Sequence, residues 1–325
     1  MPLGERINNT EKTVFVNPRN FEMNKNEVND FKNQVKLEDN TFFHAEKPKY
    51  SFSEVILNAD TYNSIQDVLA IYDKRELIFE QWGLSSTHKQ QNKAGINLYG
   101  PSGTGKTMAA NAIAQQLGRC LLKVDYSQIE SKYVGETSKN LNALFNYAKE
   151  TKSIIFFDEA DALLSKRVTD MSNSTDVSVN QTRSVLLLLI NDYDDMIIFA
   201  TNFIANYDQA FMRRILAHIK FDFPDKENRL KLWKHYIPEK MPTDVDLEKL
   251  SVEYSGITGS DISNAVFTAA LRTARNGESV VRHHYFEDAI DRIIKSKTEN
   301  SNMPFTKKTV SQDYVKSQFG GVLPK

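Results

Sequence analysis

The chain has 325 residues, 40% of them hydrophobic and 26% charged, a composition typical of a soluble globular protein. It has 41 Lys and Arg against 42 Asp and Glu, so its net charge of −1 gives no general attraction to nucleic acid or anionic membranes. It contains one cysteine, no apolar leader at its N-terminus and no apolar run of about 18 residues, so we expect a cytoplasmic protein without a membrane segment.

The first 50 residues differ from the rest, with nine asparagines among the first 40 and few apolar side chains. Such a segment buries too little apolar surface to order itself, so we predict a largely flexible extension over residues 1–50. Val28, Phe31 and Val35 recur at helical spacing and predict one short helix, docked either on the body of the protein or on a partner.

From residue 51 onward, short apolar runs alternate with longer segments of helical periodicity. Five of the runs predict buried strands, at residues 96–100, 121–126, 154–158, 196–201 and 218–223. The segments between them predict helices, at residues 107–118, 138–150 and 179–192. Alternation of this kind is typical of a parallel sheet with helices on both faces, so the sequence predicts an α/β domain over residues 51–225.

The strand pattern stops after Pro224. Helical segments then follow one another, at residues 227–237, 244–254, 261–275 and 285–296. This change predicts a small helical domain over residues 226–298 and a tail over residues 299–325.

Residues 100–107, GPSGTGKT, match the phosphate-binding pattern G-x-x-x-x-G-K-[ST], between a predicted strand and a predicted helix. Glycines let backbone N–H groups curl around phosphate oxygens, and the helix points its positive end at the same anion. We predict that Lys106 reaches the β- and γ-phosphates of a nucleotide and that the Thr107 hydroxyl holds Mg²⁺. The predicted nucleotide contacts here are Pro101, Ser102, Gly103, Thr104, Gly105, Lys106, Thr107 and Met108.

Asp158 and Glu159 come at the carboxyl end of a predicted strand, where ligands bind in open α/β sheets. Asp158 would bind Mg²⁺ through water, and Glu159 would orient and polarise the attacking water. Two acids after a strand can also merely cap a helix, but the phosphate loop favours the catalytic interpretation.

Asn202 stands at the end of the next strand, where its amide could bond the γ-phosphate and the attacking water, although an Asn there is usually a turn residue. Arg213 and Arg214 follow, and the chain has no second phosphate loop for them to serve. Arginine stabilises charge on a transferring phosphoryl group, often from a neighbouring subunit. Two surface arginines can equally form salt bridges, and the pair alone does not decide between these roles.

Together these motifs resemble the classical AAA branch of the AAA+ ATPases over about residues 52–295. GPSGTGKT, SKYVGET, IIFFDEADALLSKR, FATN and the helix DISNAVFTAA occur in that family's order. The resemblance implies a P-loop NTPase αβα sandwich with a five-stranded parallel sheet and a C-terminal α-helical lid domain. It also implies a homo-oligomeric ring, a hexamer, with ATP and Mg²⁺ at the subunit interfaces.

The resemblance implies that Arg213 and Arg214 are arginine fingers that reach the neighbouring subunit's ATP. The family's usual stretch continues as Pro-Gly-Arg-Phe-Asp, whereas this chain has Ile215, Leu216 and Ala217. The resemblance therefore does not choose between the two arginines.

The resemblance also implies an adenine pocket. Gly259 and Ser260 match the lid turn that packs near adenine, and Val55 and Ile56 resemble the opposite wall. Apolar residues at such places can also be plain core.

SKYVGE, residues 131–136, includes Lys132, Tyr133 and Val134. In the resembling family this loop faces the central pore, and its aromatic residue grips a polypeptide. A tyrosine suits that task because it offers a large face, few rotatable bonds and a polar tip. Its small and polar neighbours argue for an exposed side chain, with a buried aromatic as the alternative.

We therefore expect an ATP hydrolase that forms a ring and remodels, unfolds or disassembles a protein partner. One alternative is an ATP-gated assembly factor or structural ring that does not thread substrate. Another is an AAA+ ATPase acting on nucleic acid, which the neutral charge disfavours.

Overall fold

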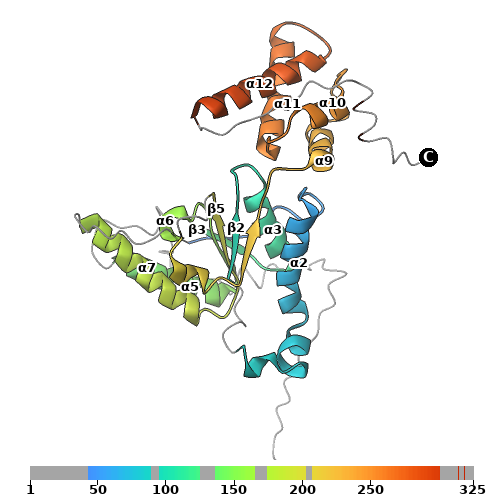
Figure 1. Cartoon of the computed structure of the whole chain (residues 1–325). Coiled ribbons are helices and arrows are strands. Elements are labelled where there is room, and N and C mark those ends of the chain that lie inside the picture. Colours follow the sequence, from blue (N-terminus) through green and yellow to red (C-terminus); the bar gives the residue numbers. More distant parts are fainter. Residues whose placement is uncertain are drawn as a thin grey trace, which may run out of the picture. The chain divides into compact units, whose positions relative to one another are not determined.

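A computed structural model of the chain describes residues 43–88, 95–124, 136–164, 174–202, 207–300, 314 and 318. Within these residues, a sheet carries helices on both faces, and a group of helices follows it in the chain (Figure 1). The strands are β1 (Ala45–Glu46), β2 (Gly95–Tyr99), β3 (Leu121–Val124), β4 (Ile154–Phe157), β5 (Ile197–Thr201) and β6 (Ala217–Lys220). Their order across the sheet is β1-β3-β4-β5-β2-β6.

Strands β2 to β6 pair in parallel, as the sequence pattern predicts. From β2 the chain crosses to β3, at the far side of the parallel strands. It then comes back through β4 to β5, which lies next to β2. It then crosses to β6 on the other side of β2. The carboxyl ends of β2, β4 and β5 therefore lie at one edge of the sheet, beside the point where the strand order reverses. Ligands bind at such points in open α/β sheets.

β1 is a sixth strand, which the sequence analysis does not predict. It pairs antiparallel with β3, with Ala45 opposite Leu122 and Glu46 opposite Leu121. Phe43, just before it, is buried in the hydrophobic core. The expected five parallel strands are present, and one short antiparallel strand extends the sheet. Two residues are too few to show the alternation by which a strand is recognised in a sequence.

Alternate residues of the parallel strands point to opposite faces of the sheet. In β4, Phe156 packs in the cluster that includes α2 and α3, whereas Phe157 packs in the cluster that includes α5, α6 and α7. The helices of this region are α2 (Ala59–Asp73), α3 (Lys106–Gln116), α5 (Glu136–Thr151), α6 (Asp161–Leu164), α7 (Ser174–Asp192) and α8 (Gln209–Met212). A π-helix, η1 (Glu76–Gln81), and a 3-10 helix, η2 (Leu84–Ser86), follow α2.

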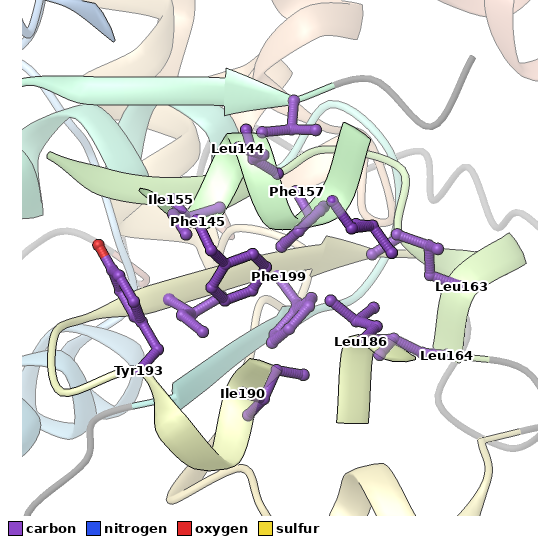
Figure 2. Packing of buried hydrophobic residues seen from close by; sticks show 14 of the residues in the cluster. Leu144, Phe145, Ile155, Phe157, Leu163, Leu164, Leu186, Ile190, Tyr193 and Phe199 are labelled. Carbon is purple, nitrogen blue, oxygen red and sulfur yellow. The ribbon is translucent and has the colours of Figure 1, made fainter. Parts of the chain in front are cut away.

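Two phenylalanines form the centre of the cluster under α5, α6 and α7 (Figure 2). Phe157 of β4 and Phe199 of β5 stack with ring centroids 5.2 Å apart and ring planes 7° apart. Leu144 and Phe145 come from α5, and Ile190 comes from α7. These contacts bury the strands that lead to Asp158 and Asn202, so they hold the two site-bearing ends in place.

The helices that follow the sheet are α9 (Lys226–Tyr236), α10 (Leu247–Glu253), α11 (Gly259–Arg275) and α12 (His283–Asn300). They enclose their own apolar cluster, in which Trp233 packs edge-on against Phe286. The buried Arg229 guanidinium donates to the Ser251 carbonyl at 2.9 and 2.7 Å and to the Pro224 carbonyl at 2.7 Å. Arg229 therefore ties α9 to α10 and to the segment that leads in from β6.

Residues 1–42 and most of residues 301–325 lie outside the described part of the chain, so the flexible extension over residues 1–42, its short helix and the tail stay predictions. The last eight residues of the predicted extension, 43–50, are described and include β1. None of the described helices is long and apolar enough to span a membrane.

Replacing Phe199 by Ala should destabilise the fold by about 3–5 kcal/mol, because it leaves a cavity in a closely packed core. Urea unfolding followed by far-UV circular dichroism measures the change. Leu188→Ala is the control, since the Leu188 side chain is 64% exposed and should cost no more than about 0.5 kcal/mol. Equal effects of the two substitutions would contradict the packing described here.

Candidate active site

The loop between β2 and α3 has a shape that only glycine permits at its start. Gly100 has a φ of +146°, and a Cβ atom there would lie 1.9 Å from the Phe221 carbonyl oxygen. Gly103 has a φ of +80°, and its Cβ would lie 2.7 Å from the Thr258 hydroxyl. Gly100, a fixed position of the phosphate-binding pattern, and Gly103, one of its variable positions, therefore let the loop lie close to β6 and to the start of α11.

Lys106 begins α3 and turns its amine back into the loop. The Nζ atom donates to the Gly100 carbonyl at 2.7 Å, the Pro101 carbonyl at 2.9 Å and the Asn202 side-chain oxygen at 3.1 Å. Burial lowers the pKa of Lys106, while Asp158 and, less strongly, Asp161 act in the opposite direction. Its hydrogen-bond acceptors are neutral, and no ion pair neutralises it within the described residues, so the site suits an anion.

Two acidic residues follow β4 directly. Asp158 Oδ2 accepts from the Thr107 hydroxyl at 3.4 Å and forms an ion pair with Lys123 Nζ at 2.9 Å. Glu159 has a φ of +50°, in the left-handed region that L-residues rarely adopt. Such a conformation costs about 1–2 kcal/mol. Residues with strained backbones of this kind cluster at active sites, where a side chain must point in one direction. The Glu159 side chain is exposed and has no polar partner in the described part of the chain.

Asn202 lies directly after β5, beside the phosphate loop. Its side-chain oxygen accepts from Lys106, and its backbone N–H donates to the Asp161 carboxylate at 3.2 Å. The preceding carbonyl, of Thr201, accepts from the Gly100 N–H at 3.2 Å. The structure thus brings the end of β5 into direct contact with the loop.

These side chains surround a cavity of about 330 Å³. The predicted site residues that line it are Val55, Ile56, Ser102, Gly103, Thr104, Gly105, Lys106, Thr107, Met108, Asp158, Glu159, Asn202, Gly259 and Ser260. Pro101 is not among the lining residues, although its carbonyl holds Lys106. The cavity joins the loop, the acidic pair and both predicted adenine walls.

The sequence analysis missed several lining residues. Leu232, His235 and Tyr236 come from α9, and Asn58 precedes α2. Asn58 donates to the Phe223 carbonyl at 3.0 Å and accepts from the Asn228 amide at 3.0 Å. The α9 residues share one helix face, but a helical pattern alone does not show what that face meets.

Ser260 lies in the first turn of α11, against the phosphate loop. Its N–H donates to the Gly103 carbonyl at 3.4 Å. Thr258 and Asp261 form a capping box at this helix start, and Lys297 of α12 binds Asp261 at 2.6 Å. The two predicted adenine-side residues at the start of α11, Gly259 and Ser260, are therefore held by the helix cap.

Arg213 and Arg214 do not line this cavity. Arg214 is anchored, because its Nε donates to the Asn191 side chain at 2.8 Å and its Nη1 to the Ala210 carbonyl at 2.8 Å. Arg213 is exposed, and its side chain has no hydrogen bond or ion pair within the described residues. Lys132, Tyr133 and Val134 lie outside the described residues.

The donor set suits magnesium held together with a nucleotide. Within the described residues, no group of three His, Cys, Asp or Glu side chains could hold a metal by itself. Mg²⁺ in nucleotide sites is usually bound through one or two protein oxygens, phosphates and waters. The Thr107 hydroxyl oxygen and Asp158 Oδ2 lie 3.4 Å apart beside the loop, and both could serve as such oxygens.

Parts of the chain are similar to known proteins. The model of the AAA family, described as ATPase family associated with various cellular activities, matches residues 96–223. A proteasome-activating nucleotidase of Methanopyrus kandleri is 31% identical over 264 residues, which are 79% of this chain and 59% of the relative. A proteasome-activating nucleotidase of Saccharolobus islandicus is 32% identical over 266 residues, 79% of this chain and 65% of the relative.

A plant protein shows the same relationship. The 26S proteasome regulatory subunit 8 homolog B of Arabidopsis thaliana is 32% identical over 245 residues, 73% of this chain and 57% of the relative. The chain thus matches about six tenths of the length of these relatives. Residues 96–223 therefore match the AAA family model, and over the shared length the chain is similar to proteasome-activating nucleotidases and a proteasomal ATPase subunit.

Proposed function

We propose that the chain binds ATP with Mg²⁺ in this cavity and hydrolyses it. The observation that carries the proposal is the meeting of Lys106, Thr107, Asp158, Glu159 and Asn202 around one cavity at the carboxyl ends of three parallel strands. The match of residues 96–223 to the AAA family of ATPases supports it.

Each of these residues has a distinct task. Lys106, buried among neutral oxygens, exchanges them for phosphate oxygens. Thr107 and Asp158 hold the magnesium ion, which neutralises phosphate charge when bound. Glu159, exposed and aimed by its backbone, orients the attacking water, and Asn202 bonds the γ-phosphate and that water.

We infer that the active assembly is a homo-hexameric ring in which Arg213 serves the neighbouring subunit's nucleotide. The anchoring of Arg214 on Asn191 and Ala210 gives that arginine a structural task. Arg213 is exposed and without a polar partner in the described part of the chain, so it is the side chain able to reach another subunit.

The work done with ATP is the remodelling, unfolding or disassembly of a protein partner, with Tyr133 as the residue that grips it. The relatives are named for the proteasome, which supports a protein partner over a nucleic acid. A net charge of −1 supports the same choice. We place this activity in the cytoplasm, a reducing compartment that suits a chain with a single cysteine.

Glu159→Gln should still bind ATP but not hydrolyse it, because the amide cannot act as a base. Light scattering on a sizing column with Mg-ATP should then give a mass near six times 37.2 kDa. The same variant without nucleotide, and wild-type protein under both conditions, are the controls. A monomer at concentrations where bound ATP is demonstrated would contradict the ring.

Arg213→Ala should bind ATP normally and lose at least about tenfold in turnover, since it removes a charge from the transition state of the neighbouring subunit. Arg214→Ala should instead lower the thermal unfolding temperature. Mixing Arg213→Ala with Glu159→Gln should restore turnover, because some interfaces then combine an intact Glu159 with an intact Arg213. The control mixes two preparations of one variant, and failure to restore any turnover would argue against action in trans.

Tyr133→Ala separates threading from a purely assembly-linked switch. A threading ring should retain ATP turnover but lose processing of the partner that the Glu159→Gln ring captures, because the gripping face is gone. Tyr133→Phe keeps that face and should retain processing. Normal processing by Tyr133→Ala would favour an ATP-gated assembly factor.

A further inference from the structure

A lysine on a neighbouring strand lies against the carboxylate assigned to magnesium. Lys123 is the third residue of β3, where it is aligned with Phe156 of β4, two residues before Asp158. The Lys123 Nζ atom is 2.9 Å from Asp158 Oδ2, the oxygen that also accepts from the Thr107 hydroxyl. Lys123 belongs neither to the phosphate-binding pattern nor to the residues that line the cavity.

The two partners differ in their access to water. The Asp158 side chain is 18% exposed, whereas that of Lys123 is 51% exposed. A mostly buried carboxylate needs a cation or a donor, but a half-exposed ammonium loses little by turning to solvent. The pair can therefore separate with the lysine moving and the aspartate staying in place.

A second carboxylate is within electrostatic reach of the lysine. Glu46 on β1, the strand next to β3, pairs with Lys49 at 2.8 Å. The hydrogen bond from Lys49 is the main cause that lowers the pKa of Glu46, and the charge of Lys123 adds a small effect in the same direction. The charge of Lys123 thus acts on the exposed Glu46 carboxylate as well as on the one in the site.

We propose that Lys123 competes with Mg²⁺ for Asp158 and so sets the magnesium concentration at which nucleotide binding tightens. This inference rests on the proposed nucleotide site. Without nucleotide, the ion pair satisfies Asp158 and disfavours binding of a divalent cation alone. With nucleotide, the phosphates add enough negative charge for the metal to displace the lysine.

The competition has a measurable consequence by thermodynamic linkage. If Mg²⁺ must displace Lys123, removal of the lysine charge raises metal affinity in the nucleotide complex. By linkage, the factor by which Mg²⁺ tightens nucleotide binding equals the factor by which nucleotide tightens Mg²⁺ binding. Titration of either ligand therefore reports the same coupling. A partly exposed ion pair is weak, so we expect a shift of about two- to fivefold.

The test titrates Mg²⁺ against binding of a fluorescent ADP analogue, so hydrolysis plays no part. Full-length wild-type protein is compared with Lys123→Met, which removes the charge but keeps an unbranched side chain of nearly the same length. Lys123→Arg retains the charge. Lys295→Met removes another exposed lysine that is 4.0 Å from a carboxylate, that of Glu299, on α12.

Mg²⁺ should raise the affinity for the ADP analogue in both proteins. We expect Lys123→Met to reach half of this increase at a free Mg²⁺ concentration about two- to fivefold lower than wild type needs. Lys123→Arg and Lys295→Met should match wild type. A Lys123→Met value equal to or higher than that of wild type would overturn the inference and leave the nucleotide site intact. If wild type failed to bind the ADP analogue at any Mg²⁺ concentration, the proposed function itself would fail, and this inference with it.

Lys123→Gln guards against a folding defect in the methionine variant. It keeps a polar side chain at this half-exposed position but removes the charge, so it should lower the Mg²⁺ requirement in the same direction. Circular dichroism and binding of the ADP analogue in EDTA establish that each variant is folded. A normal Mg²⁺ requirement in a folded Lys123→Gln protein would also overturn the competition.

Discussion

The parallel pairing of β2 with β5 is the constraint on which the candidate site depends. It aligns Tyr99 with Thr201, so the phosphate loop and Asn202 leave the sheet at the same level. β4 pairs with β5 in the same direction and delivers Asp158 and Glu159 to that edge. A shift of any one strand by two residues would move its polar end by about 7 Å, farther than any hydrogen bond in the site. The stack of Phe157 on β4 against Phe199 on β5 makes such a shift costly, because it would separate two buried rings.

Two lysines at the site, Lys106 and Lys123, are bonded to protein groups that a bound ligand could replace. Lys106 donates to neutral oxygens of its own loop and to Asn202, and Lys123 pairs with Asp158. Lys106 keeps its positive charge available to an anion, and the Lys123 pair leaves the mostly buried Asp158 carboxylate compensated. Binding of an anion with a divalent cation would exchange these partners, so the same contacts that hold the site together without ligand are those that ligands replace.

Sequence patterns predicted the part of this molecule that depends on local chemistry. GPSGTGKT requires glycine where the backbone passes the Phe221 carbonyl, and the buried strands are read from uninterrupted apolar runs. The patterns did not predict β1, whose two residues gain their structure only by pairing with β3. They also missed Asn58 and the α9 wall of the cavity, because those positions acquire a role only when distant segments meet.

The sequence by itself determined the residue types of a phosphate loop, an acidic pair and an arginine pair, since each is a short pattern with its own chemistry. Only the tertiary structure decided their partners. Arg214 donates a hydrogen bond to Asn191, whereas Arg213 is exposed. Lys123 on β3 forms an ion pair with Asp158, which follows the neighbouring strand β4. These distinctions arise from distances between residues far apart in the chain, and such distances follow from how the strands pair and the helices pack.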